Sequence, residues 1–470
     1  MLTLESLKKE RIFYYFTELC KIPHGSGDMQ KINEYCVQFA KEHSLEYYTD
    51  DLFNVIIKKK ASVGHEDHPA VILQGHLDMV CEKEPQVDID FLNDPINVLT
   101  DGEFLFADHT TLGADNGIAV AMMLSILEDN SLEHPPIEAV FTTDEETGMY
   151  GALALDTSLL NARRLINIDS EEQGVLTAGC AGGITANTCV YLTSESVNNP
   201  CYEIKVGSLL GGHSGIDIDK NRLNANKVMA ELLNSLEQDY NLVSISGGDK
   251  NNAIARNCSA VISCKTDPTA EIENIKATLK NETETPEITV CKTQSSSTAV
   301  SVADSKKIIS FMCDAPNGVI TYSQNIEGLV QTSLNMGVVR TEANTVKVVF
   351  ALRSAKTSEL EDLKNQLSAL ADKIKGNIEF EGAYPAWEYR ENSPLRDTLC
   401  NIYESMYKTK MKVDVIHAGL ECGLLSEKID GLDAVSIGPD LYDVHTPKER
   451  LDIASARSTY EYLCKVLKNL

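Results

Sequence analysis

Strand-length runs of apolar residues, separated by helical patterns, constrain the fold of this chain more than any other feature. Such runs occupy residues 54–57, 70–74, 137–142 and 165–168. Between the second and third runs, residues 115–127 are apolar on every side and begin with an acid, as a buried helix does. Strands that alternate with helices favour a sheet covered by helices on both faces. The sequence therefore predicts an α/β fold with a mixed sheet.

The length of the chain predicts more than one domain. A single hydrophobic core stops growing at about 250–300 residues, and this chain has 470 residues, 43% of them hydrophobic. Residues 186–384 have a different pattern, in which a β-α-β unit of about 100 residues reads as though it occurs twice. We predict one domain made of residues 1–185 and 385–470, into which residues 186–384 are inserted as an internally duplicated α+β domain.

Charge and cysteine usage exclude several classes of protein. The formal net charge of −28 repels phosphate backbones, so nucleic acid is not an expected partner. The 13 cysteines are irregularly spaced and include no Cys-x-x-Cys pair, which is typical of thiols in a reducing compartment. The sequence shows no cleavable signal pattern and no run approaching the roughly 18 apolar residues of a membrane span. We expect a soluble, cytoplasmic protein that does not bind membranes.

Histidines and carboxylates follow the predicted strands. Strands 70–74, 137–142, 165–168 and 434–437 are each followed by such residues, and an aspartate opens the helix 115–127. In α/β sheets, ligands collect beyond the carboxyl ends of the strands. The candidate residues are His76, Asp78, Asp115, Glu145, Glu146, Asp169 and His445.

Each of these residues has a plainer explanation when it is taken alone. Asp115 could cap the N-terminus of its helix, and Asp169 could cap the loop that follows it. Glu145 and Glu146 could form a solvated acidic turn. His76 could be a surface histidine. It is the repetition of metal-ligand types at successive strand ends that favours a common site.

The set also has a chemical logic. Two histidines and three carboxylates suit two zinc ions that share one carboxylate. Of the paired Glu145 and Glu146, one can bind metal while its neighbour stays free to move a proton. Asp78 follows His76 by two residues and points the same way along an extended chain, so it can accept the second imidazole N–H. The predicted cofactor is a pair of Zn²⁺ ions, for which Mn²⁺ or Co²⁺ could substitute.

The motifs around these residues resemble those of a known family. They are QGHLDMV (74–80), TLGADNGIA (111–119), TTDEETGM (142–149), INIDSEE (166–172), GGHSG (211–215), HAGLECG (417–423) and DVHTPKE (443–449). In this order they are similar to the aminoacyl-histidine dipeptidases, also called Xaa-His dipeptidases or the bacterial peptidase D type, which are carnosinase-like. That group belongs to the di-zinc superfamily of aminoacylases and carboxypeptidase G-type metallopeptidases. The resemblance covers nearly the whole chain.

The resemblance implies how the metals are held. His76 and Asp169 would hold one zinc ion, and Glu146 and His445 would hold the other. Asp115 would bridge the two ions, and a cis peptide bond would follow it.

The resemblance also implies a reaction. Unblocked dipeptides, including those of the Xaa-His type, would be hydrolysed by a zinc-bridged hydroxide with Glu145 as the general base, while Asp78 orients His76. Residues 186–384 would form a lid that closes over the substrate and contributes His213 to stabilise the oxyanion. His213 could instead be a histidine at a helix start without a catalytic part.

Three further residues would contact the substrate. By the resemblance, Asn252 in NNAIA and Arg353 in ALRSA would hold the substrate carboxylate, to which arginine can donate two parallel hydrogen bonds. The NNAIA segment departs from the superfamily, which often has proline where Ala255 stands. Glu421 could recognise the free amino group of the substrate or could be a structural hydrogen-bond acceptor, and both interpretations stay open.

Two alternative functions stay open as well. An N-acyl-amino-acid amidohydrolase of the same architecture would use the same metals and base with a different pocket. A catalytically silent metal-binding relative would keep the fold, although the predicted base and ligands are all present here. The enlarged lid could replace a partner subunit or could provide the surface of a homodimer.

Overall fold

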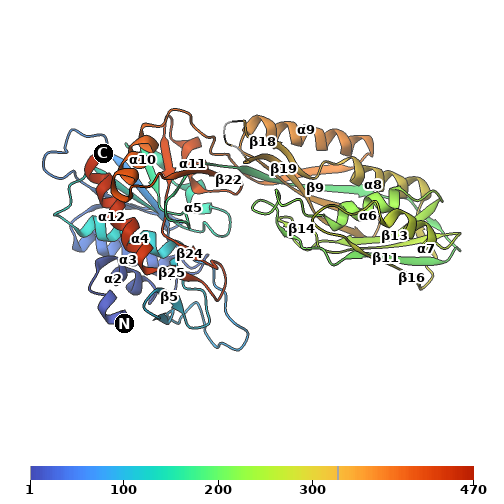
Figure 1. The fold of residues 1–470 in the computed structure, drawn as a ribbon, viewed down its shortest axis with the longest axis horizontal. Coiled ribbons are helices and arrows are strands. Elements are labelled where there is room, and N and C mark those ends of the chain that lie inside the picture. Colours follow the sequence, from blue (N-terminus) through green and yellow to red (C-terminus); the bar gives the residue numbers. More distant parts are fainter. Residues whose placement is uncertain (1, 325, 327) are drawn as a thin grey trace. The chain divides into compact units, whose positions relative to one another are not determined.

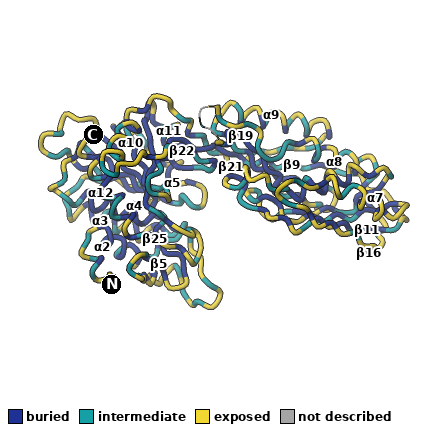
Figure 2. Tube along the Cα trace, in the orientation of Figure 1, coloured by how far each residue is buried: buried dark blue, intermediate teal, exposed yellow. Residues whose placement is uncertain are grey.

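The chain forms two compact units in the computed structural model, which describes residues 2–324, 326 and 328–470 (Figure 1). Unit 1 consists of Met1–Gly179, Tyr389–Val415 and Leu420–Leu470, and unit 2 consists of Cys180–Glu388 and Ile416–Gly419. Each unit has its own principal sheet and its own buried core (Figure 2). The predicted boundaries at 185 and 384 and the lid role of the inserted segment stay predictions.

Unit 1 is built around an eight-stranded sheet with the order β1-β2-β6-β3-β7-β23-β8-β22. Strand β3 pairs in parallel with β6 and β7, whereas β2 pairs antiparallel with β1 and β6. Every residue of β3 and β6 is buried, so both faces of the sheet are covered. The predicted mixed α/β sheet is confirmed. Its strands are β1 (Glu46–Thr49), β2 (Val55–Lys59), β3 (Val71–His76), β6 (Ile137–Thr142), β7 (Arg164–Asn167), β8 (Val175–Cys180), β22 (Lys412–Ile416) and β23 (Asp433–Ser436).

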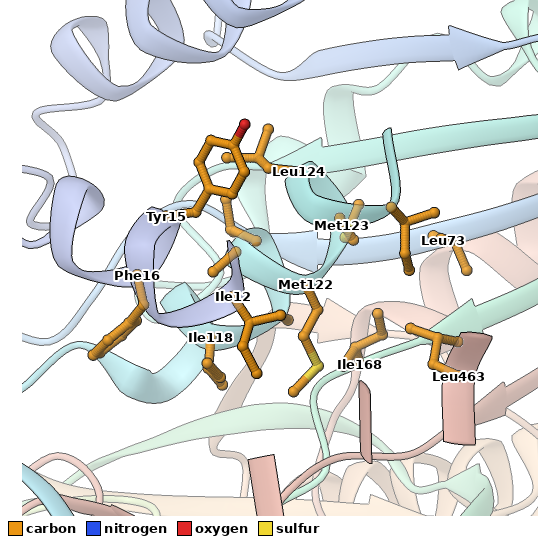
Figure 3. Close-up of a cluster of buried hydrophobic side chains, with 14 of the residues drawn as sticks. Ile12, Tyr15, Phe16, Leu73, Ile118, Met122, Met123, Leu124, Ile168 and Leu463 are labelled. Atoms are coloured by element: carbon orange, nitrogen blue, oxygen red, sulfur yellow. The ribbon is translucent and has the colours of Figure 1, made fainter. Parts of the chain in front are cut away.

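Helix α4 is the central helix of unit 1. Its residues are buried from Asn116 to Leu127, as expected for a helix that is apolar on every side. It packs against β3 and α2, and Figure 3 shows Ile12 and Phe16 of α2 beside Ile118 and Met122 of α4. The helices of unit 1 are α1 (Leu4–Leu7), α2 (Arg11–Leu19), α3 (Gln30–Glu42), α4 (Ala114–Glu128), α5 (Tyr150–Ala154), α10 (Pro394–Tyr407), α11 (Glu421–Lys428) and α12 (Ile453–Asn469), with a 3-10 turn at Thr157–Leu159.

A smaller sheet of unit 1 carries the C-terminal segment that contains His445. Its order is β24-β25-β5-β4, and His445 lies in the turn between β24 and β25. Its strands are β4 (Val98–Thr100), β5 (Phe104–Ala107), β24 (Leu441–Tyr442) and β25 (Arg450–Asp452).

Unit 2 contains a nine-stranded sheet. Eight of its strands follow the order β16-β11-β15-β13-β19-β20-β9-β21, and the ninth, β18, pairs with β19 outside this order. Its strands are β9 (Gly182–Tyr191), β11 (Cys201–Gly207), β13 (Tyr240–Gly247), β15 (Cys258–Cys264), β16 (Glu287–Thr293), β18 (Gly318–Tyr322), β19 (Val330–Glu342), β20 (Thr345–Ser354) and β21 (Asn377–Tyr384). Its helices are α6 (Ala225–Asn234), α7 (Thr269–Lys276), α8 (Val302–Asp314) and α9 (Thr357–Lys373). Two short ladders, β10 (Ser194–Ser196) with β17 (Thr298–Val300) and β12 (Gly212–His213) with β14 (Ala253–Ile254), complete the unit.

The order of elements in unit 2 is similar in its two halves. The series α6-β13-β15-α7-β16 is followed by α8-β19-β20-α9-β21, and the two halves of the sheet meet where β13 pairs with β19. This order favours the predicted internal duplication, which stays a prediction. None of the helices in the described part of the chain combines the length and the apolar character that a membrane span requires.

Candidate metal centre

The residues predicted as metal ligands lie together in unit 1, at the carboxyl ends of the central strands. β3 ends at His76, Glu146 lies in the loop after β6, and Asp169 follows β7 by two residues. Because β3 pairs in parallel with β6 and β7, the residues after these strands emerge at one edge of the sheet. Asp115 stands in the first turn of α4 and His445 in the turn after β24. Sequence segments far apart along the chain therefore converge there.

The side chain of Asp115 lies between two imidazoles. His76 Nε2 is 3.3 Å from Asp115 Oδ1 and 3.4 Å from Asp169 Oδ1. His445 Nε2 is 3.1 Å from Asp115 Oδ2 and 2.9 Å from Glu146 Oε1. The two oxygens of Asp115 thus face different histidines.

The imidazole of His76 directs its Nε2 atom toward the carboxylates. Its Nδ1 lies 3.0 Å from the backbone oxygen of Asp78 and 3.4 Å from Oδ1 of the same residue. Both oxygens accept, so Nδ1 carries a proton, and loss of the second ring proton would leave Nε2 as the lone-pair donor to a metal. Nε2 faces Asp115 and Asp169, whose ionised carboxylates only accept. A positive charge is therefore favoured between them, and it is supplied either by a proton on Nε2 or by a bound cation.

The spacing of these atoms fits metal coordination. Ligand atoms that bind zinc tetrahedrally at about 2.1 Å lie about 3.4 Å apart, close to the 3.3 and 3.4 Å found around His76 Nε2. One atom each from His76, Asp115 and Glu146 lies within 4.8 Å of the others. Imidazole nitrogen and carboxylate oxygen suit Zn²⁺, Mn²⁺ and Co²⁺. The donors present therefore fit two cations with Asp115 between them.

The protein charges around the site raise the proton affinity of both imidazoles. Burial disfavours a charged ring at His76, but the carboxylates of Asp169 and Asp115 outweigh it and hold its pKa well above the usual range. Hydrogen bonds to Asp115 and Glu146 raise the pKa of His445 to about 11. Burial raises the pKa of Asp169 to about 6. A bound cation has to displace the protons that these groups hold.

Asp78 fixes the turn that carries the two predicted glutamates. Its buried carboxylate accepts hydrogen bonds from the backbone N–H of Glu145 at 3.0 Å and of Glu146 at 3.2 Å. The Ser26 hydroxyl donates to it at 2.8 Å. Burial raises the pKa of the Glu145 carboxyl well above its usual range. Asp78 therefore contacts both His76 and the turn of the predicted base.

Glu449 is a residue of this site that the sequence interpretation missed. It is 2% exposed, and its Oε2 accepts hydrogen bonds from the backbone N–H of Leu112 at 2.7 Å and Gly113 at 3.1 Å. Its Oε1 accepts from Ala114 at 2.7 Å and Asp115 at 3.2 Å. Glu449 thus ties the backbone beneath Asp115 to the segment of His445. Its place in the DVHTPKE motif was the one available signal.

Asn116 is a second residue that the interpretation missed. Its Oδ1 accepts a hydrogen bond from the backbone N–H of His76 at 3.2 Å, and its Nδ2 donates to the carbonyl of Ile168 at 2.7 Å. The peptide bond between Asp115 and Asn116 is cis, as predicted. One amide side chain therefore links the three backbone segments that carry His76, Asp115 and Asp169.

Glu421 is fully buried, at 0% exposure. Gln74 Nε2 and Thr142 Oγ1 donate to its Oε2 at 2.5 and 2.7 Å. Burial raises its pKa to about 7. Its Oε1 is buried without a hydrogen-bond partner among the described residues. The contacts of Oε2 fit a structural acceptor and the unpaired Oε1 fits recognition of an amino group, so both interpretations stay open.

The other predicted residues belong to unit 2. His213 Nδ1 accepts hydrogen bonds from the backbone N–H of Gly215 at 3.2 Å and of Ile216 at 3.1 Å. Burial, and after it the charge of Arg353, lower the pKa of His213. The ring is therefore neutral at pH 7, with its proton on Nε2.

Arg353 and Asn252 differ in how firmly they are held. An Arg353 Nη1 donates to the hydroxyl of Tyr384 at 2.7 Å. Asn252 is exposed, and its backbone carbonyl accepts a hydrogen bond from the N–H of Ser214 at 2.8 Å. The guanidinium of Arg353 is thus oriented by a neighbouring side chain, whereas Asn252 makes this contact through its backbone.

Comparison with known proteins finds strong similarity along the whole chain. Residues 72–469 match the model of peptidase family M20/M25/M40. The chain is 36% identical to the cytosol non-specific dipeptidase of Escherichia coli, over 100% of this chain and 99% of that protein. The crystal structure of an aminoacylhistidine dipeptidase from Vibrio alginolyticus matches with a TM-score of 0.91 and 35% identity, over 100% of this chain and 98% of that one. An aminopeptidase PepT from Bacillus cereus shares the fold at a TM-score of 0.60 and 15% identity, over 98% of each chain.

Zinc binding to the metal-free protein should release protons. Because the pKa of His445 is raised to about 11 and that of His76 is also raised, both rings hold a proton at neutral pH that zinc must displace. Affinity should therefore fall as the pH falls, by up to about 100-fold per pH unit if two protons leave. Calorimetric titrations in buffers of different ionisation enthalpy measure this release. Binding without proton release would contradict the charge states described above.

Replacing Glu449 by glutamine should weaken zinc binding about 10–100-fold. The amide keeps one acceptor but turns its N–H₂ toward backbone donors, which releases part of the Leu112–Asp115 turn. Glu138→Gln is the matched control, since Glu138 is 4% exposed and accepts from the backbone N–H of Asn161 and Ala162, outside the site. Equal zinc affinity in both variants, measured by competition with a chelator, would show that Glu449 does not position Asp115.

Proposed function

The chain belongs to peptidase family M20/M25/M40, and from this membership we propose that it is a dipeptidase that cleaves unblocked dipeptides with two zinc ions. The observation that carries the proposal is the Asp115 carboxylate between the imidazoles of His76 and His445. The full-length similarity to a dipeptidase supports the substrate class. That relative is described as cytosolic, which supports a cytoplasmic location for this chain as well.

His76 and Asp169 would hold one zinc ion, Glu146 and His445 the other, and Asp115 both. The distances between their nitrogen and oxygen atoms support this assignment. When bound, a zinc pair polarises a carbonyl and lowers the pKa of water beside it.

Glu145 would move the proton in this reaction. It would take a proton from the attacking water, whose oxygen bonds to the carbonyl carbon, and give it to the nitrogen as the C–N bond breaks. Burial raises the pKa of the Glu145 carboxyl in the metal-free protein, and a buried carboxylate accepts a proton more readily than an exposed one. General acid–base catalysis of this kind contributes about 10²–10⁴-fold. Asp78 would keep Glu145 in place through the turn that it holds.

His213 and Arg353 would contact the substrate from unit 2. The Nδ1 of His213 is occupied by two backbone donors, so Nε2–H would be the donor to the charge that develops on the carbonyl oxygen. Arg353, held by Tyr384, would bind the substrate carboxylate through parallel hydrogen bonds. Asn252 would assist at that carboxylate. Recognition of a free carboxyl end favours short substrates.

The zinc-loaded protein should hydrolyse free dipeptides and leave their N-acetylated analogues largely uncleaved. Glu145→Gln is the matched inactive control, which should keep its zinc and lose about 10²–10⁴-fold in kcat. Release of amino acids and zinc content are measured on the same samples. Preference for the acetylated compounds would favour an N-acyl-amino-acid hydrolase, and a zinc-loaded protein inert toward both would favour a silent relative.

His213→Ala should lower kcat by about 10²–10³-fold without changing zinc content. The loss removes a neutral N–H donor from the transition state and touches none of the proposed ligands. Steady-state kinetics with one good dipeptide, together with metal analysis, test this expectation. Full retention of kcat would exclude the oxyanion role and would mean that His213 only stabilises the turn after β12.

A further inference from the structure

An apolar cavity of about 330 Å³ lies in unit 1 and shares a wall with the candidate metal centre. Its lining includes Met79, Val80, Cys81, Phe91, Leu92 and the predicted ligand Glu146. Sites for small organic groups are typically of this kind, largely apolar and from about 300 Å³ upward in volume.

The polar groups of the cavity wall are already engaged. Glu146 Oε1 is 2.9 Å from His445 Nε2. Ser26, which also lines the cavity, donates its hydroxyl proton to Asp78. No lysine or arginine is among the described residues of the lining. An anionic side chain in this cavity would lose its hydration and would meet the carboxylate of Glu146 instead of an opposite charge, whereas an apolar one would be favoured.

The backbone of Leu92, a residue of the cavity wall, is held by hydrogen bonds. Asp90 accepts hydrogen bonds from the backbone N–H of Leu92 at 3.1 Å and from Asn93 Nδ2 at 2.7 Å. Lys31 Nζ donates to the carbonyl of Leu92 at 2.6 Å. The Leu92 side chain is nevertheless 59% exposed. A leucine whose backbone is fixed while its side chain faces solvent can be covered by a ligand with little loss of conformational entropy.

The position of Cys81 in the cavity wall depends on a residue without a side chain. A Cβ at Gly25 would lie 2.5 Å from Cys81 Sγ, and Gly25 forms a bridge with Met79. The absence of a side chain at Gly25 therefore leaves Cys81 in its place within the lining.

A larger cavity of about 850 Å³ lies in unit 2, along parts of β11, β13 and β15. Among the described residues that line it are none of the predicted ligands or catalytic groups. Of these two cavities, only the smaller has a proposed metal ligand, Glu146, among the described residues of its lining.

We propose that the cavity beside Glu146 receives the side chain of the amino-terminal residue of the dipeptide and selects apolar side chains there. This inference rests on the proposed function. The carbonyl that is attacked belongs to the amino-terminal residue, so the Cα of that residue is one bond from the reacting carbon. The carboxyl-terminal residue lies beyond the scissile nitrogen, and its carboxylate is assigned to Arg353. The pocket next to a metal ligand is therefore the one nearest the amino-terminal side chain.

Two dipeptide series test the pocket on the zinc-loaded full-length protein. In an Xaa-Gly series, Leu-Gly and Met-Gly should exceed Asp-Gly in kcat/KM by about 10–200-fold, the range that apolar pockets achieve. A Gly-Xaa series reports on the other side of the scissile bond. An Xaa-Gly series cleaved without regard to Xaa would overturn the pocket assignment while leaving the dipeptidase proposal intact. No cleavage of any dipeptide would overturn both.

Leu92→Asp should reduce the ratio of kcat/KM for Leu-Gly to that for Gly-Gly by about tenfold, and Leu92→Ala by less. Selectivity within the Gly-Xaa series should not change. Leu153→Asp is the matched control, because Leu153 of α5 is a leucine of similar exposure, 54%, outside the lining. The inference would be overturned if Leu92→Asp left the ratio of kcat/KM for Leu-Gly to Gly-Gly unchanged. It would also be overturned if, at constant zinc content, selectivity changed equally in the Xaa-Gly and Gly-Xaa series.

Discussion

One carboxylate shared between two imidazoles is the constraint on which the rest of unit 1 depends. The two oxygens of Asp115 face His76 and His445, which are more than 350 residues apart in the sequence. For the Asp115 carboxylate to contact both imidazoles, the backbone of Asp115 has to be fixed by residues that precede it and by residues that follow it. Glu449 binds the N–H groups beneath Asp115, and Asn116 ties its other side to β3 and to the end of β7. The central sheet supplies the strand ends, and Glu449 and Asn116 hold the backbone of Asp115 beside them.

Buried charge is the second problem that this arrangement solves. A carboxylate withdrawn from water is costly unless donors or cations surround it. Asp78 and Glu449 are both buried and accept several backbone hydrogen bonds each. Asp169 and Glu145 have raised pKa values because burial outweighs their favourable contacts. Burial also raises the pKa of Glu449, to about 7, in spite of its backbone donors. Asp78 and Glu449 thus hold backbone segments of the site, whereas Asp169 and Glu145 are the carboxyls proposed to bind a cation and to move a proton.

The strand pattern could be predicted because it is local. Strand β6 has the predicted bounds, Ile137–Thr142, and the residues that follow the parallel strands converge as the topology requires. Glu449 and Asn116 could not be found this way. Glu449 contacts backbone groups more than 330 residues away, and a glutamate before arginine reads as an ordinary solvated charge. Asn116 reads as a turn residue in Ala-Asp-Asn-Gly. Asp78 was predicted for its contact with His76, but its bonds to the Glu145–Glu146 turn depend on how two strand ends meet.

The two units carry different parts of the proposed chemistry. All the proposed ligands, the base and the apolar cavity belong to unit 1. His213 and Arg353, the proposed hydrogen-bond donors to the oxyanion and to the substrate carboxylate, belong to unit 2. Metal affinity and the choice of amino-terminal side chain can therefore change through residues of unit 1 alone. Recognition of the carboxyl end can change through unit 2 without disturbing the ligands. A fold organised in this way can keep one hydrolytic reaction while recognition of the carboxyl end diverges, because the residues proposed to bind that end are separate from those proposed to hold the metals.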